Sequence, residues 1–318
     1  MEKILDTLNT ALKAIEDNGK RTDELSGVPS GFVSLDKITS GWEKSDLIVI
    51  ASRPSMGKTA FTLSVARNTS VSFKIPTLFI SLEMSGVQIA NKLMCMESEL
   101  SLEKIRTGQL VDHEWCQLDA KIKNIQHATL FLQTKLFELS AIKKECQEFK
   151  SQHNDGLIII DNLQQIINSE KQYVTREHEL GDIVRELKRL TMDLELPIII
   201  TASLNRALEM RGGDMRPRLS DLKDTGEIEN IADSVIFVYR PEYYGIQQDE
   251  EGNSTMGLGQ LIVAKNRYGD TCDVNLRFRK EFGRFEEWDS MGLAELPWLE
   301  ENITTISSSM NGSIEAPF

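Results

Sequence analysis

The sequence lacks the cysteine patterns that build disulfide scaffolds and zinc sites. Its 318 residues include four cysteines and four histidines, with no Cys-x-x-Cys pair and no histidine at metal-ligand spacing. A structural zinc site requires such spacing. Scattered cysteines are instead typical of reduced, buried thiols, and we expect that state at Cys95, Cys116, Cys146 and Cys272.

Long apolar runs are absent as well. No stretch approaches the roughly 20 apolar residues that a membrane-spanning helix needs. The N-terminus is polar and acidic, unlike a signal peptide. We therefore expect a cytoplasmic protein with no membrane partner.

Positive charge is scarce. The chain has 36 Lys and Arg against 49 Asp and Glu, which gives a formal net charge of −13. A protein that coats duplex DNA usually has the opposite sign. If this chain binds nucleic acid, its basic groups must be concentrated on a few loops along a confined path.

The chain does contain a regular alternation of short apolar runs and helical patterns, beginning at Asp46. The apolar runs are Leu47–Ala51, Leu78–Leu82, Leu157–Ile160, Ile198–Ala202 and Val235–Tyr239. Helical patterns such as Glu179–Leu194 lie between them. This alternation predicts an α/β domain with a twisted parallel sheet and helices on both faces. Two later runs, Gln260–Ala264 and Asp273–Phe278, flank the turn at 267–270 and predict a C-terminal β-hairpin.

Both ends of the chain differ from this pattern. Residues 1–18 predict a helix with one apolar stripe, formed by Ile4, Leu5, Leu8, Leu12 and Ile15. A polar, turn-rich stretch at 19–31 predicts a flexible linker, so the helix either folds back on its own domain or, as the tether favours, docks on a neighbouring subunit. We assign 32–298 to the main domain. Residues 299–318 are rich in Ser, Thr and Asn, and we predict disorder there.

The strongest motif comes after the first apolar run and precedes a helical pattern, which is the context of a phosphate-binding P-loop. Its residues are Ser52, Arg53, Pro54, Ser55, Met56, Gly57, Lys58, Thr59 and Ala60. Backbone N–H groups and the helix N-terminus favour the phosphates of ATP, and Gly57 lets the backbone approach them. We expect Lys58 to reach the β- and γ-phosphates and the Thr59 hydroxyl to bind Mg²⁺. Ser52 occupies the place of the usual first glycine.

Two carboxylates complete the predicted site. Asp161 ends a continuous apolar strand, as a Walker B aspartate does, and would hold Mg²⁺ beside the P-loop. Glu83 ends the next strand after the P-loop and would orient and deprotonate the attacking water. Glu83 alternatively caps the helix that begins near Met84.

Six short motifs give the chain a family resemblance. They occupy residues 53–59, 81–84, 160–164, 204–206, 220–229 and 264–269, and occur in the order seen in DnaB-type replicative DNA helicases. The resemblance covers about 27–288 and is to the C-terminal RecA-like motor domain of a phage or bacterial helicase. It implies a homo-hexameric ring with ATP at each subunit boundary, 5′→3′ translocation on single-stranded DNA, and unwinding at the fork. Primase and a helicase loader are further partners that it implies.

The resemblance also assigns roles to residues outside the P-loop. It makes Glu83 the catalytic base, and it makes Lys265 and Arg267 a pair that reaches the γ-phosphate in the neighbouring subunit, where they would stabilise transition-state charge. Without the resemblance, both residues are interpreted as a solvated hairpin tip.

The same resemblance places DNA contacts late in the chain. Lys223, Asp224 and Gly226 match positions that contact the sugar–phosphate backbone, which suits sequence-independent binding. Arg206 begins a nearby basic segment that also contains Arg211, Arg216 and Arg218. This segment supplies the local positive charge that DNA binding requires, or else it is a mobile solvated loop.

The chain departs from the family pattern in several places. Ser203 replaces a glutamine thought to sense the γ-phosphate, so coupling to DNA must run through water or another residue. Asn162 stands where an aromatic residue is frequent. The helical N-terminal domain of full-length members, on which the family places primase contact, has no counterpart here, so we expect either the motor part alone or a naturally short helicase.

Two other functional classes share parts of this pattern. A RecA/RadA-type recombinase would share the P-loop, Glu83 and Asp161, but its polymerisation motif and DNA loops differ from the residues that come after Asp161 in this chain. A DNA-dependent ATPase scaffold, or a KaiC-like ATP-binding oligomer, would retain the fold without translocation. The intact Lys58, Thr59, Glu83 and Asp161 argue against a scaffold that has lost turnover.

Overall fold

A computed structural model describes residues 25–288 except 212 and 214, together with seven positions near the N-terminus. Those seven positions (4, 5, 8, 9, 12, 13 and 16) are helical, and the side chains of Ile4, Leu5, Leu8 and Leu12 are exposed. All seven positions lie within the predicted helix 1–18, and the four exposed side chains belong to its predicted apolar stripe. The predicted tail 299–318 lies outside the described residues.

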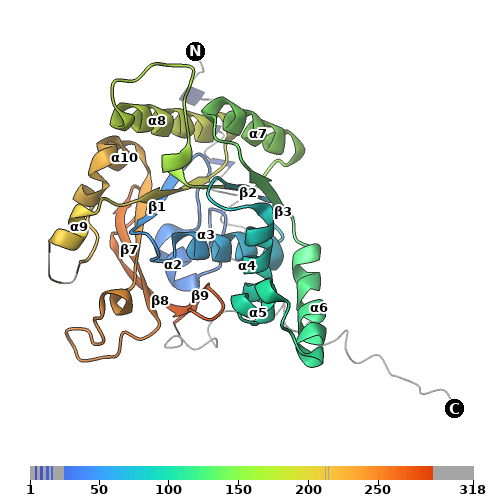
Figure 1. Ribbon diagram of the computed structural model, residues 1–318. Coiled ribbons are helices and arrows are strands. Elements are labelled where there is room, and N and C mark those ends of the chain that lie inside the picture. The colour runs from blue at the N-terminus through green and yellow to red at the C-terminus, as the bar shows by residue number, and fades with distance from the viewer. Residues whose placement is uncertain are drawn as a thin grey trace. The chain divides into compact units, whose positions relative to one another are not determined.

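The fold is built on a nine-stranded sheet with the order β3-β2-β4-β5-β1-β6-β7-β8-β9 (Figure 1). The strands are β1 Leu47–Ser52, β2 Thr77–Ser81, β3 Leu130–Thr134, β4 Leu157–Asp161, β5 Ile198–Ser203, β6 Ser234–Tyr239, β7 Leu258–Asn266, β8 Cys272–Arg279 and β9 Arg284–Glu287. The six strands from β3 to β6 run parallel, and β7, β8 and β9 extend the sheet in antiparallel fashion.

Helices cover both faces of the sheet. The α-helices are α2 Val33–Thr39, α3 Lys58–Arg67, α4 Gly86–Ser98, α5 Leu102–Thr107, α6 Asp112–Gln126, α7 Leu139–Gln152, α8 Arg176–Leu194, α9 Ala207–Met210 and α10 Gly226–Ile231. One apolar core packs α7 and α8 against the sheet, and a second core packs α2, α3 and α4 against the other face (Figure 1). The predicted RecA-like α/β architecture is therefore confirmed.

The sequence patterns located most of the sheet but not its edges. All five apolar runs form parallel strands, and the predicted hairpin is formed by β7 and β8. The edge strand β3 escaped prediction because Phe131 and Leu132 are about 40% exposed and leave no buried run. The four-residue strand β9 also escaped, since three of its four residues are charged.

One compact unit extends from Gly27 to Glu287. The backbone N–H of Gly27 donates to Ser40 O, and Val28 pairs with Trp42. The last part of the predicted linker therefore belongs to the folded domain.

The four cysteines are free thiols. Cys95 and Cys146 are buried as expected. The expectation of burial is wrong for Cys116, which is exposed, and for Cys272, which is half-buried. Within the described part of the chain, no helix combines the length and apolar character that crossing a bilayer demands.

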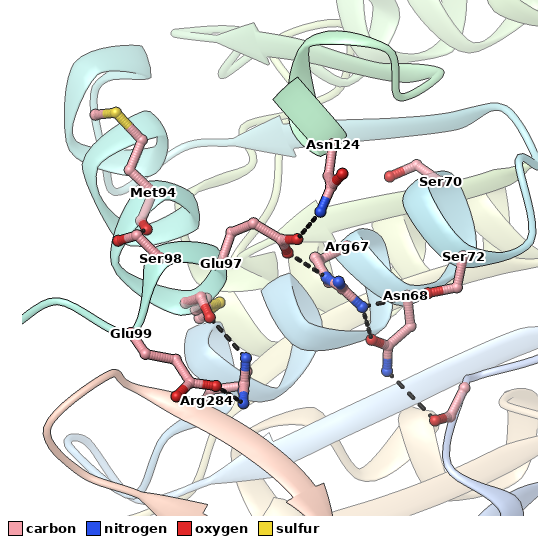
Figure 2. A network of polar contacts seen from close by, with 12 residues as sticks. Arg67, Asn68, Ser70, Ser72, Met94, Glu97, Ser98, Glu99, Asn124 and Arg284 are labelled. Atoms are coloured by element: carbon pink, nitrogen blue, oxygen red, sulfur yellow. Dashed lines mark hydrogen bonds and ion pairs between the residues drawn. The ribbon is translucent and has the colours of Figure 1, made fainter. Parts of the chain in front are cut away.

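A polar network ties α3, the helix after the P-loop, to the helices beside it (Figure 2). Arg67 at the end of α3 donates to the buried Glu97 of α4 (2.7 Å), and Asn124 of α6 donates to the same carboxylate (2.7 Å). Arg284 of β9 donates to Met96 O at 2.7 Å and pairs with Glu99 at 3.0 Å. The network thus joins α3, α4, α6 and the outer strand β9.

Glu97→Gln should lower the free energy of unfolding by about 1–3 kcal/mol at neutral pH, because Arg67 would lose its anionic partner in a mostly buried position. The matched control is Glu148→Gln, which removes an exposed pair with Lys144 (3.7 Å) and should cost about 0.5 kcal/mol or less. Denaturant titration of both variants measures the difference.

The effect should depend on pH in one direction. Burial favours a higher pKa for Glu97, but hydrogen bonds from Arg67 and Asn124 outweigh burial and lower that pKa. The stabilisation is therefore present above the ordinary glutamate pKa and is lost as the pH falls through the lowered pKa. A stability gap between the wild-type chain and Glu97→Gln that widened in acid would contradict this interpretation.

Candidate functional site

The predicted P-loop connects β1 to α3 at the carboxyl edge of the parallel strands. Gly57 precedes α3 with φ +104°, in the region that favours glycine. A Cβ at Gly57 would also approach the Phe285 ring to 3.2 Å. Both the turn into the helix and the packing of β9 therefore require glycine at this position.

A cavity of about 430 Å³ opens beside this turn. Its lining includes the predicted residues Pro54, Ser55, Gly57, Lys58, Thr59, Ala60 and Glu83. Burial lowers the pKa of the Lys58 ammonium, while the charges of Asp161 and Glu83 oppose that shift. The volume and the half-buried cation suit a nucleotide polyphosphate.

Asp161 lies at the end of β4, directly beside the start of α3. Its Oδ2 accepts a hydrogen bond from Thr59 Oγ1 at 2.8 Å, and its Oδ1 accepts one from Thr201 Oγ1. A hydroxyl and a carboxylate are the oxygen ligands that Mg²⁺ prefers. No cluster of three or more His, Cys, Asp or Glu side chains that could hold a metal lies in the described residues, so phosphate oxygens would have to supply further ligands.

Glu83 comes shortly after β2 and lines the same cavity. Asn162, which is almost fully buried, donates a hydrogen bond from its amide to Glu83 Oε1. The alternative that Glu83 caps the next helix is wrong, because α4 begins at Gly86 and Ser85 forms its capping box with Gln88. The Asn162 amide thus orients the Glu83 carboxylate, which does not cap a helix.

Ser203, at the end of β5, also lines the cavity. Its hydroxyl lies 3.4 Å from Lys58 Nζ. Gln164 holds the backbone of Ser203 through two hydrogen bonds: Ser203 N donates to Oε1 (3.1 Å), and Nε2 donates to Ser203 O (3.3 Å). The short side chain therefore meets the P-loop lysine from a fixed backbone position.

Three predicted P-loop residues lie outside the cavity lining: Ser52, Arg53 and Met56, all of them buried. Arg53 points toward the segment after β5 instead. Its Nη1 donates to Leu204 O at 2.8 Å, and its Nε pairs with Glu209 at 2.9 Å. Arg53 therefore joins the P-loop to the predicted DNA-binding region rather than contacting the cavity.

Several cavity residues escaped the sequence interpretation. They are Lys92, Cys95 and Leu102 from α4 and α5, and Phe278, Lys280, Glu281, Phe282 and Gly283 from β8 and the turn before β9. The Cys95 thiol donates to Phe282 O at 3.4 Å, which joins the two groups. No local pattern signals their approach to the P-loop, because it depends on how β8 and β9 pair.

Lys265 and Arg267 lie near the amino ends of the parallel strands, opposite the carboxyl ends that carry the P-loop. β7 runs antiparallel to β6, so Lys265 pairs with Val235 near the amino end of β6, and Val235 pairs with Val49 of β1. Arg267 Nη1 contacts Asp233 (2.9 Å), a residue that also bonds Leu47 at the start of β1. The rise of roughly 3.3 Å per residue separates Leu47 from Ser52 by about 17 Å. Arg267 therefore cannot reach the P-loop of its own protomer.

The predicted DNA-binding residues cluster between β5 and β6. Lys223 and Asp224 belong to the 3₁₀ segment Leu219–Thr225, and Gly226 begins α10; their side chains lie outside the part that the structure describes. Arg206 is exposed and precedes α9. Arg211 pairs with Asp221 (3.1 Å) and Arg216 pairs with Asp273, so part of the basic segment is neutralised internally.

Comparisons with known proteins identify the family to which this chain belongs. The chain is 36% identical over 285 residues to the replicative DNA helicase DnaB of Geobacillus stearothermophilus, which covers 89% of this chain and 62% of the relative. It is 34% identical to the replicative DNA helicase DnaC of Bacillus subtilis, with the same coverage. The chain thus spans about 62% of the length of these curated relatives.

Solved structures give the same result. One, an ATPase domain, matches with a TM-score of 0.83 and 30% identity, covering 91% of this chain and 100% of that one. Another is described as a DnaB-like replicative helicase and its interactions with primase, and matches with a TM-score of 0.79 and 30% identity, covering 91% and 68%. A family model described as the DnaB-like helicase C terminal domain matches residues 27–287. This chain therefore belongs to the DnaB-like helicase C-terminal domain family.

Proposed function

We propose that this chain is the ATP-hydrolysing motor of a hexameric replicative DNA helicase that moves 5′→3′ along single-stranded DNA in the cytoplasm. The observation that carries the proposal is the placement of the site's two halves. One half lies at the carboxyl ends of the parallel strands and consists of Lys58, Thr59, Glu83 and Asp161. The other half, Arg267, lies near the amino ends of the same strands. Because one protomer cannot close this site alone, the fold favours catalysis between subunits.

Each residue has a chemical task in this proposal. Lys58 binds the β- and γ-phosphates of ATP, and Glu83, oriented by Asn162, takes the proton of the attacking water. Thr59 and Asp161 would hold Mg²⁺, which neutralises phosphate charge when bound. Arg267 and Lys265 of the adjacent subunit stabilise charge on the γ-phosphate.

DNA binding in this proposal falls to the segment between β5 and β6, with Lys223, Asp224, Gly226 and Arg206. A lysine charge and backbone N–H groups suit phosphate contacts that ignore base sequence. The segment supplies local positive charge within a chain of net charge −13. Docking of the N-terminal helix 1–18 on a neighbouring subunit, and contact with primase or a loader, belong to the same proposal.

Two sets of hydrogen bonds link the ATP site to this segment. From the P-loop, Ser52 O accepts from Leu204 N at 3.1 Å, and the next residue, Asn205, donates from its N–H to Asp221 O at 3.3 Å. The other half of the site is the Lys265–Arg267 pair, which we call the finger. Lys265 Nζ donates to Glu229 O (2.7 Å) within α10. Each half of the proposed ATP site is thus connected to the segment of the predicted DNA contacts by one or two hydrogen bonds.

The decisive experiment measures assembly and activity on one sample. Native mass measurement with an ATP analogue and a forked DNA should give a six-subunit complex, because the site needs two protomers. Phosphate release should rise with protein concentration as rings form, and unwinding should accompany it. A protomer that never associates yet turns over ATP at full rate, whether or not DNA is present, would overturn the proposal.

Glu83→Gln should retain ATP binding and reduce turnover by roughly 100- to 10,000-fold, since the amide keeps the shape but cannot take a proton. Binding of a fluorescent ATP analogue and phosphate release measure the two effects separately. Glu148→Gln, on the surface of α7, is the control and should match the wild-type chain in both assays. Retained turnover in Glu83→Gln would assign the base elsewhere.

Glu209→Gln should uncouple ATP hydrolysis from DNA, because it removes the ion pair that holds Arg53 toward the DNA-binding segment. Glu209 is half exposed and touches neither nucleotide nor metal positions, so basal phosphate release and the free energy of unfolding should stay near wild type. Stimulation by single-stranded DNA should fall several-fold, measured as the ratio of phosphate release with and without an oligonucleotide. Full stimulation in this variant would exclude the Arg53–Glu209 ion pair as the link.

A further inference from the structure

The carboxylate of Asp233 occupies an unusual position between α10 and β6. Its side chain is fully buried. Oδ1 accepts from Arg267 Nη1 at 2.9 Å, and Oδ2 accepts from Lys188 Nζ at 2.6 Å and from Leu47 N at 2.8 Å. One buried anion therefore contacts the predicted finger, the long helix α8 and the start of the P-loop strand.

Arg267 is held by Asp233 in two ways. Besides the side-chain contact, Arg267 N donates to Asp233 O at 3.0 Å. The Arg267 side chain is nevertheless 58% exposed, and the carboxylate engages only Nη1 among its donors. An arginine side chain that must be ordered on binding loses rotamer entropy. A contact that orders Arg267 beforehand removes much of that loss while leaving donors for a phosphate.

The charges around Asp233 keep Arg267 electropositive. Lys188 shares the carboxylate, so two cations face one anion. The neighbouring Asp46 is only partly ionised at neutral pH, because burial, and after it the charge of Asp233, raise its pKa to about 7. Asp233 therefore orients the guanidinium without cancelling the positive charge of the cluster.

We propose that Asp233 is the positioning residue for Arg267, holding its guanidinium at the subunit edge in the orientation that meets the γ-phosphate in the neighbouring protomer. The inference rests on the proposed function, because it needs a finger that acts between subunits. A purely structural role for Asp233 predicts a different effect. Its substitution would then disturb Leu47 and β1, and through them the P-loop of the same subunit.

Subunit mixing separates these two roles. Rings of full-length Asp233→Asn chains should release phosphate roughly 10- to 100-fold more slowly, the loss expected for a misplaced catalytic group, while each subunit binds ATP analogue normally. Rings of Glu83→Gln chains should be inactive. Mixed rings should regain turnover, because the intact P-loop of an Asp233→Asn subunit then meets the normal finger of a Glu83→Gln subunit.

A parallel arm with Arg267→Ala in place of Asp233→Asn distinguishes the possible failures. If Arg267→Ala is complemented and Asp233→Asn is not, Asp233 acts within its own subunit, and this inference is wrong while the proposed function stands. If neither is complemented, the finger does not act between subunits, and both fail.

A double-mutant cycle adds a second criterion. Asp233→Asn should slow a ring of Arg267→Ala chains no further, because Asp233 acts only through Arg267. Additive losses would overturn the inference. Thermal unfolding of each variant checks folding, and Asp233→Glu, which keeps the charge, replaces Asp233→Asn in every arm if the asparagine chain does not fold.

Discussion

The strand β1 is the constraint on which the rest of the molecule depends. All six of its residues are buried, and it pairs in parallel with β5 on one side and β6 on the other. Such a strand is held along its whole length and cannot bend to bring its ends together. Its carboxyl end carries the P-loop, and its amino end bonds Asp233, which holds Arg267. Association between copies thus becomes a geometric requirement for the proposed chemistry.

The sequence predicted the parts of this site that local patterns specify. Two features could be predicted from a single segment each: a glycine before a lysine at a strand–helix turn, and an aspartate that ends an apolar run. Both lie at the cavity or beside it. The turn at 280–283 was not readable, because it reaches the P-loop only after β8 and β9 extend the sheet. Asp233 gave no signal either: its partners Leu47, Lys188 and Arg267 come from three distant segments.

The sequence indicated that the basic segment from 206 to 218 would supply the positive charge that the proposed DNA binding needs. The structure leaves less of that charge available. Of the four arginines from 206 to 218, Arg211 and Arg216 are paired with carboxylates inside the same domain. Their role is to fix the path of the segment rather than to supply free charge. In the proposed function, this domain would therefore offer fewer phosphate contacts than its count of basic residues, and a ring would have to multiply those contacts by symmetry.

The loss of the family glutamine at Ser203 then has a physical explanation. In the proposed function, the coupling that the family resemblance assigns to a glutamine at this position would run through other hydrogen bonds. Leu204 N bonds the P-loop strand, Asn205 N bonds Asp221, and Lys265 bonds the carbonyl of Glu229. The first two bonds are backbone bonds and the third is donated by the Lys265 side chain, so none of them depends on the side chain at position 203, and the proposed coupling does not require a glutamine there. The segment 219–231 is bonded to both halves of the ATP site, and in the proposed ring it would respond to nucleotide on either side of its subunit.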